Sequence, residues 1–161
     1  MTTEIMNRPT RRGVLCVVAA IVAYPARAGE VSYVNPRFGT TITFPGEVFS
    51  LPQPPSENGD GMSWASPDGA WLGVWGQYNA LDHDEKALLD FLAPEFDEVT
   101  YGKAGKGFVV LSGLDDGKVF YQRTNFGRDG VLHSMLMRYP QHRHANFDRL
   151  AIAVAASLKG P

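Results

Sequence analysis

The sequence predicts an α+β fold, in which helices pack on a mostly antiparallel central sheet. Three Asp-Gly pairs separate apolar segments, at Asp68-Gly69, Asp116-Gly117 and Asp129-Gly130. This pair suits tight β-hairpins because both residues tolerate positive φ angles. Two further segments space their apolar residues as one face of a helix. Because hairpins dominate over alternating strands and helices, an antiparallel sheet is favoured over a parallel one.

Residues 29–61 predict one strand and one loop. Thr40–Phe44 is rich in β-branched residues and stops at Pro45-Gly46, which is typical of a strand. Residues 29–36 before it are expected to form a short lead-in without regular structure. Residues 52–61 contain three prolines, two glycines and no large apolar residue, so they are expected to form an exposed loop.

The three hairpins account for the remaining strands. The first joins residues 62–66 to 70–78, and the other two share a strand and so predict a three-stranded meander over 107–114, 118–127 and 131–139. In the last strand the odd-numbered positions are mainly apolar. This alternation predicts a sheet with one covered side.

Two helices complete the fold. Asp82 and Glu85 match a capping box, with Asp82 as the N-cap and Glu85 reaching back to it, and Pro94 ends that helix. A second helix is expected at residues 145–159. Its apolar stripe faces the sheet and consists of Phe147, Leu150, Ala151, Val154 and Leu158.

The first 28 residues have the layout of an export signal. Arg11 and Arg12 precede an uncharged run of ten residues, Val14–Ala23, and Ala26-Arg27-Ala28 follows as an A-x-A cleavage motif. That run is shorter than the ~20 residues that span a bilayer. Cleavage after Ala28 is expected to leave residues 29–161 as one globular domain without a transmembrane segment, in the periplasm or secreted.

The export route stays open between two alternatives. Arg11-Arg12 with the following apolar residues resembles the twin-arginine signal of bacteria, which a receptor reads as an address. A general secretory signal that happens to contain two arginines is the alternative.

The composition of the mature domain disfavours nucleic-acid binding. The full chain has 15 basic and 17 acidic residues, and residues 1–28 contain four arginines and one glutamate. The mature domain therefore keeps 11 basic and 16 acidic residues, a net charge of −5, with no basic stripe. The only cysteine, Cys16, lies in the signal, so the exported domain depends on its core and not on disulfides.

No catalytic residue, metal site or cofactor is assigned from the sequence. His142 and His144 lack a third ligand nearby. His133 and Ser134 are adjacent on a strand and point to opposite faces, so they cannot pair as base and nucleophile. The loop Glu57–Gly61 lacks the spacing of a calcium loop.

The aromatic residues of the first hairpin are the candidate binding residues. Trp71 and Trp75 are four positions apart and share a face of a strand, and Trp64 is expected to pair across from them. An aromatic core is the simpler interpretation. The alternative is a ring-lined groove for a protein or small-molecule partner, with Glu57 and Asp60 at its rim.

Residues Tyr33–Gly39 and Ile42–Phe49 form an aromatic lead-in, an alternating strand, a Phe-Pro pair and a large aromatic residue. This pattern resembles the opening of PsbP-like domains, the superfamily of the photosystem II extrinsic protein, although Phe49 stands where many members have Trp. The meander and the C-terminal helix ending at Ala155–Leu158 are similar too. The resemblance implies an α/β/α sandwich around an antiparallel sheet. Its members are largely non-catalytic accessory or docking proteins, so it implies no catalytic residues.

These observations favour an exported, periplasmic, non-catalytic binding or accessory protein. Two alternatives stay open. One is a small periplasmic hydrolase or metal-dependent enzyme that uses His133, His142 or His144 with loop carboxylates. The other is an inhibitor or immunity-type protein that uses the loop 52–61.

Overall fold

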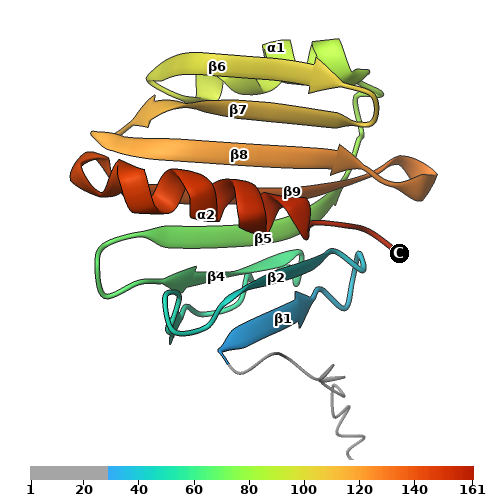
Figure 1. The fold of residues 1–161 in the computed structure, drawn as a ribbon. Coiled ribbons are helices and arrows are strands. Elements are labelled where there is room, and N and C mark those ends of the chain that lie inside the picture. Colours follow the sequence, from blue (N-terminus) through green and yellow to red (C-terminus); the bar gives the residue numbers. More distant parts are fainter. Residues whose placement is uncertain (1–28) are drawn as a thin grey trace, which may run out of the picture.

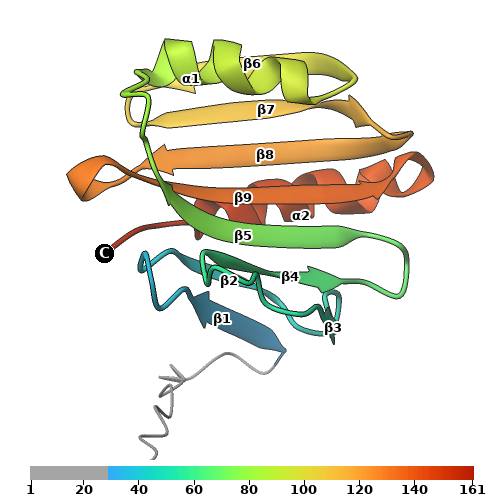
Figure 2. The same cartoon turned by 180° about the vertical axis from the view of Figure 1, so that it is seen from behind.

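The computed structural model describes residues 29–161, and Figures 1 and 2 show its two opposite sides. The predicted export signal, with Arg11, Arg12, Ala26 and Ala28, lies outside the described residues. The elements follow one another as β1 (Glu30–Val34), β2 (Thr41–Pro45), β3 (Leu51–Pro52), β4 (Gly61–Ala65), β5 (Trp71–Tyr78), α1 (Glu85–Leu92), η1 (Ala93–Glu95), β6 (Glu98–Gly105), β7 (Phe108–Asp115), β8 (Lys118–Phe126), η2 (Arg128–Gly130), β9 (Val131–Pro140), η3 (Gln141–Arg143) and α2 (His144–Ala156).

A seven-stranded antiparallel sheet forms the middle layer, in the order β3-β4-β5-β9-β8-β7-β6. Strands β6 to β9 are neighbours both in sequence and in the sheet, so the meander has four strands where three were predicted. β1 and β2 form a separate two-stranded sheet. The predicted α+β class with a mostly antiparallel sheet is confirmed.

Both faces of the central sheet are covered, α2 and the β1–β2 hairpin lying on one side and α1 on the other (Figures 1 and 2). Met135 and Met137 of β9 are buried in the cluster beneath α2. Leu132 and Leu136 of the same strand are buried in the cluster beneath α1. The alternation in β9 predicted one covered side, and that prediction is wrong because both sets of its apolar residues are buried. The sandwich that the resemblance implied is present.

The three Asp-Gly turns are confirmed. Asp116 and Gly117 have φ angles of 49° and 70°, and Asp129 and Gly130 have 56° and 68°. Positive φ at both central residues matches the right-handed twist of the flanking strands. In the turn at Asp68-Gly69 only the glycine has a positive φ, of 82°.

Three strands were not predicted. The shortest, β3, is only Leu51–Pro52 and pairs with β4 at the start of the loop expected at residues 52–61. β1 occupies residues expected to be irregular, and its hairpin turn is held by Asn35, whose Oδ1 accepts hydrogen bonds from the backbone N–H groups of Arg37 and Phe38. β6 is glycine-rich and mostly exposed, so it carries little apolar periodicity. Its hairpin with β7 turns at Lys106-Gly107, where Gly107 has a φ of 78°.

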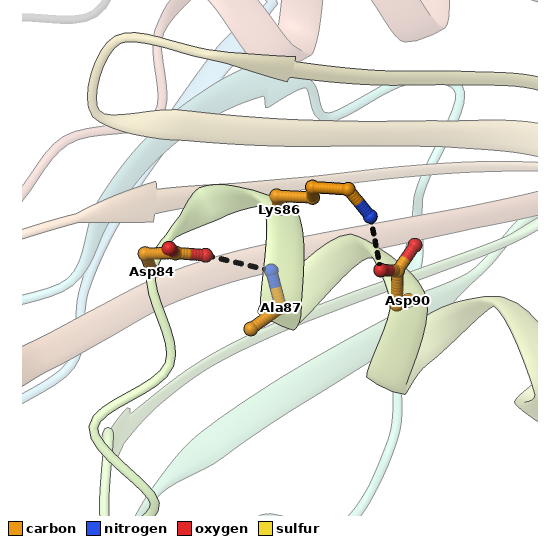
Figure 3. Close-up of polar contacts among 4 residues, drawn as sticks. All are labelled: Asp84, Lys86, Ala87 and Asp90. Atoms are coloured by element: carbon orange, nitrogen blue, oxygen red, sulfur yellow. Dashed lines mark hydrogen bonds and ion pairs between the residues drawn. The ribbon is translucent and has the colours of Figure 1, made fainter.

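Helix α1 begins later than predicted, and its N-cap is Asp84. The Oδ1 atom of Asp84 accepts a hydrogen bond of 2.8 Å from the N–H of Ala87 (Figure 3). Asp82 has a φ of 49° and lies in the preceding turn, where Asn79 exchanges two hydrogen bonds with the backbone of His83.

The predicted capping box is therefore wrong. Glu85 does not reach back to Asp82 but accepts a hydrogen bond of 2.8 Å from the N–H of Gly107 in the β6–β7 turn. Lys86 and Asp90 form an exposed ion pair along the same helix (Figure 3).

Helix α2 confirms the second predicted helix, with slightly different ends. Phe147, Ala151 and Val154 are buried against the sheet. After its last turn, Ser157 Oγ donates to the backbone oxygens of Val154 and Thr43, which fastens the helix end to β2.

The N-cap assignment predicts that Asp84→Ala lowers the free energy of unfolding by about 1 kcal/mol, because one N–H of the first turn loses its acceptor. Asp84→Asn keeps an acceptor and should retain most of that stability. Urea unfolding measures both. Asp82→Asn is the matched control, expected to stay within about 0.5 kcal/mol of the unchanged protein. A larger loss from Asp82→Asn than from Asp84→Ala would contradict the assignment.

Candidate functional site

The sheet face beneath α2 is only partly covered. In Figure 1, α2 lies in front of the centre of the sheet, whereas no helix lies in front of β6 and β7. A cavity of about 700 Å³ lies beside α2 over these open strands. We call it the α2 groove. Its apolar lining includes Tyr101, Val110, Leu114, Val119, Tyr121 and Ile152.

Strand register brings the groove residues together. Tyr101, Ser112 and Tyr121 lie directly opposite one another on β6, β7 and β8, so their side chains share a face of the sheet. Tyr101 is 52% exposed and Ile152 of α2 is 59% exposed. Large apolar side chains are therefore open to solvent on both sides of the groove, which is unusual for a surface with no partner.

One end of the groove carries a hydrogen-bonded phenol. The hydroxyl of Tyr139 donates to Asp148 Oδ1 at 2.7 Å, and His144 Nδ1 lies 3.6 Å from Asp148 Oδ2. Burial and this hydrogen bond hold the pKa of Tyr139 far above its ordinary value. Burial also raises the pKa of Tyr121. Both phenols therefore stay neutral near pH 7.

The other end of the groove is basic. The guanidinium of Arg123 stacks on the Phe108 ring, 4.4 Å from its centroid, and its Nε donates to Asn125 Oδ1 at 2.8 Å. Lys103 lies 5.9 Å from the centroid of the same ring. The groove thus runs from a neutral phenol and a carboxylate at one end to two cations at the other.

A second cavity, of about 570 Å³, adjoins this basic end. We call it the basic pocket. It lies where the β6–β7 turn, the β8–β9 turn and the segment after α2 meet, and it shares Phe108 and Arg123 with the α2 groove. Its other basic side chains are Lys106, Arg128 and Lys159.

His133 is buried at the wall of the basic pocket. Its Nδ1 lies 2.8 Å from the hydroxyl of Thr40, and its Nε2 has no hydrogen-bond partner among residues 29–161. A Cβ atom added at Gly127 or Gly160 would come within 2.3 Å or 2.2 Å of Nε2. Glycine at both positions therefore leaves room for the ring. Burial lowers the pKa of His133.

The three tryptophans do not line one groove. Trp71 and Trp75 share a face, as predicted, and pack against the cluster beneath α1. Trp64 lies opposite Leu72 and is buried on the other face, 4.6 Å from the ring centroid of Phe44. The expected pairing of Trp64 across from the other two is wrong, because the register places it one residue out of phase with them.

Glu57 and Asp60 lie in the predicted loop, which is folded against the β1–β2 turn. Asn35 Nδ2 donates to the backbone oxygen of Gly59, and Arg37 donates to that of Asn58. Glu57 is exposed and Asp60 is half-buried. Partner binding by these two residues and the tryptophans stays a prediction.

The histidines named for the enzyme alternative are not brought together. His133 lies near one end of β9, and His142 follows its other end. His144 begins α2, whose 13 residues span about 20 Å before the chain reaches the His133 end. Within residues 29–161, no three His, Cys, Asp or Glu side chains are grouped so that they could hold a metal ion.

The groove residues were not singled out from the sequence. Their signal was the alternation at Val110, Ser112 and Leu114, which was interpreted only as a strand. A second signal was Ile152, an apolar residue off the buried stripe of α2.

The described helices, α1 and α2 included, are all too short or too polar to cross a membrane. The chain matches no family model and no curated protein. Among solved structures it is similar to the solution structure of cyanobacterial PsbP (CyanoP) from Synechocystis sp. PCC 6803. The TM-score is 0.62 at 14% sequence identity, and the match covers 89% of this chain and 98% of that chain.

The chain has a PsbP-like fold. The fold expected from residues Tyr33–Gly39 and Ile42–Phe49 is thereby confirmed. At this identity the likeness of the PsbP-like domain to CyanoP is one of fold, and the site described above is a property of this chain alone.

The burial of His133 predicts lower stability in acid. Because its pKa is lowered in the folded state, the unfolded chain binds the proton more readily below about pH 6.5. Stability should therefore fall as the pH drops from about 7.5 to about 5.5. Thermal unfolding of the unchanged domain and of His133→Gln measures this fall, which should be smaller in the variant. The exposed His142→Gln is the control, expected to behave as the unchanged domain; equal falls in all three would contradict the prediction.

Proposed function

We propose that this PsbP-like domain is an exported, non-catalytic binding or accessory protein of the periplasm, and that it binds a small apolar ligand in the α2 groove. The α2 groove is the observation that carries the proposal. Its volume of about 700 Å³ lies within the range of about 300–1,000 Å³ for small-molecule sites.

The composition of the groove supports binding over chemistry. Its surface is mostly apolar side chains of the sheet and of α2, with a few polar groups at its ends. Such a lining provides affinity by burying apolar area and orients a ligand through its ends. Asp148 is its one carboxylate side chain, and it already accepts a hydrogen bond from Tyr139.

The concave shape favours a small molecule over a protein partner. A docking surface for a protein would bury about 800 Å² on each side, and the tryptophan hairpin with Glu57 and Asp60 remains the candidate for such a contact. The inhibitor or immunity alternative also uses that part of the chain. Neither cavity is lined by the three tryptophans, Glu57 or Asp60, so a groove variant tests ligand binding without changing the candidate partner contact.

The proposal predicts that filling the groove abolishes binding of a neutral apolar dye. N-phenylnaphthylamine should fluoresce more strongly with the mature domain, and Ser112→Phe should weaken its binding by about tenfold or more, because the new ring occupies space between Tyr101 and Tyr121. Fluorescence titration measures the dissociation constant.

The control is Ser32→Phe, the same change at an exposed position of β1 outside the groove. It should bind the dye as the unchanged domain does. Equal dye binding by both variants, with both folded by circular dichroism, would show that the groove is not the binding site.

The export part of the proposal has its own test. In a bacterial host, the full chain should yield a periplasmic product whose first residue is Gly29, as read by N-terminal sequencing. Arg11→Lys combined with Arg12→Lys should block export by the twin-arginine route and leave general secretion intact. An uncleaved chain that stays in the cytosol would contradict export by either route.

A further inference from the structure

We infer that the ligand of the α2 groove is an anionic amphiphile, whose apolar chain lies over β6–β8 and whose acidic head group enters the basic pocket. This inference rests on the proposed function and adds the chemical class of the ligand. The observation that supports the inference is that two cavities lie side by side and share Phe108 and Arg123.

The two cavities adjoin along β7, and Phe108 and Arg123 line both of them. Ser112, Val110 and Phe108 alternate along β7 on the groove face, and the path from Ser112 to Phe108, four residue steps, spans about 13 Å. Arg123 lies opposite Val110, beside this path. An elongated ligand that follows β7 therefore passes the guanidinium of Arg123 before it reaches the basic pocket.

The basic side chains at the end of this path form no ion pairs among residues 29–161. The mature domain is acidic, with 11 basic and 16 acidic residues. Five of those 11 basic residues line the two cavities, namely Lys103, Lys106, Arg123, Arg128 and Lys159. None of the five takes part in an ion pair among residues 29–161, where the pairs engage Lys86, Arg138, Arg143 and His144.

Acidic side chains are nearly absent from the lining of this path; Glu85 lies beside the basic pocket, where it accepts a hydrogen bond from the N–H of Gly107, but it lines neither cavity. Among the described residues, Asp148 is the one acidic side chain that lines either cavity, and it lies with Tyr139 at the far end of the groove. The path is therefore neutral or acidic at one end and basic at the other. This polarity matches a ligand with one acidic head group.

His133 leaves one polar atom unsatisfied behind the wall of the basic pocket. Its side chain is 1% exposed, and its Nε2 is buried without a partner among residues 29–161. Buried polar atoms are rarely left without a hydrogen bond. When the hydroxyl of Thr40 donates to Nδ1, Nε2 carries the ring proton and faces the wall formed by Gly127 and Gly160. The two glycines cover Nε2, so a ligand oxygen reaches that proton only when Gly127 or Gly160 shifts away from the ring.

The test compares an acid with its neutral ester. Dansylaminoundecanoic acid and its methyl ester have the same chain and dye, and fluorescence titration of the mature domain measures both. The acid should bind at least about tenfold more tightly, as expected for a charge-assisted contact to an arginine or lysine. High ionic strength should weaken binding of the acid and leave binding of the ester unchanged.

Charge-removing variants locate the head group. Lys106→Gln and Lys159→Gln should each weaken binding of the acid severalfold to tenfold and leave binding of the ester unchanged. Arg123→Gln, which also alters the groove lining, should weaken binding of the acid more than binding of the ester. Arg149→Gln is the matched control, because Arg149 is exposed on α2 and lines neither cavity. Lys106 and Lys159 are also exposed, so their variants keep the test valid if Arg123→Gln does not fold.

The outcomes separate this inference from the proposed function. Equal affinity for acid and ester, with no effect of the three variants, would overturn the anionic head group while the groove remains a binding site. Loss of acid binding in Arg149→Gln to the same degree as in Lys159→Gln would overturn the basic pocket as its place. Failure of the neutral dye, the acid and the ester to bind at all would overturn the proposed function itself.

Discussion

One helix is too narrow to cover a face of a seven-stranded sheet. A helix with its side chains is about 10 Å across, and neighbouring strands lie about 4.8 Å apart, so α2 can cover only two or three strands. It packs on β8 and β9, and the β1–β2 hairpin extends the cover over β5 and β4 through Phe44 and Trp64. Nothing in the described chain extends it over β6 and β7. The α2 groove exists because the sheet is wider than the helix and the hairpin that cover this face.

The opposite face differs because α1 packs on the strands that α2 leaves open. Leu88 of α1 is buried with Val109 and Leu111 of β7 and with Phe120 of β8. The odd-numbered residues of β7 therefore belong to a closed core, while its even-numbered residues line an open groove. β6 can stay at the edge of the sheet because its exposed residues include charges and glycines, which discourage pairing with another chain. Each helix thus covers part of one face: α1 lies over β6 and β7, and α2 leaves the same two strands open on the opposite face.

Local chemistry decided which elements could be predicted. The Asp-Gly turns require only positive φ at two adjacent residues, so Asp116-Gly117 and Asp129-Gly130 were recognisable without tertiary information. The N-cap at Asp84 was not, because Asp82 and Asp84 are equivalent by type and the choice depends on Asn79, which holds the backbone at His83 in a turn.

The candidate site depended on longer-range features. The side on which Trp64 lies depends on the register between β4 and β5, where Trp64 faces Leu72. No periodicity within either strand reveals that register. The groove and the basic pocket could not be predicted from local sequence patterns, because both form where several strands meet α2 or the segment after it. Their charges were visible in the sequence only as scattered lysines and arginines within an acidic domain.

The basic pocket also lies where the start of β2 meets the segment after α2. Thr41 of β2 exchanges two backbone hydrogen bonds with Lys159, of 2.8 Å and 3.0 Å, and the neighbouring Thr40 bonds the ring of His133. Gly160 packs on the same ring from the C-terminal side. A ligand held there would contact Lys159 and Gly160, in the segment that joins the start of β2. A ligand that binds only the folded state stabilises that state by mass action. Occupancy of the pocket is therefore expected to stabilise the pairing of β2 with the segment after α2, and that pairing in turn keeps the pocket formed.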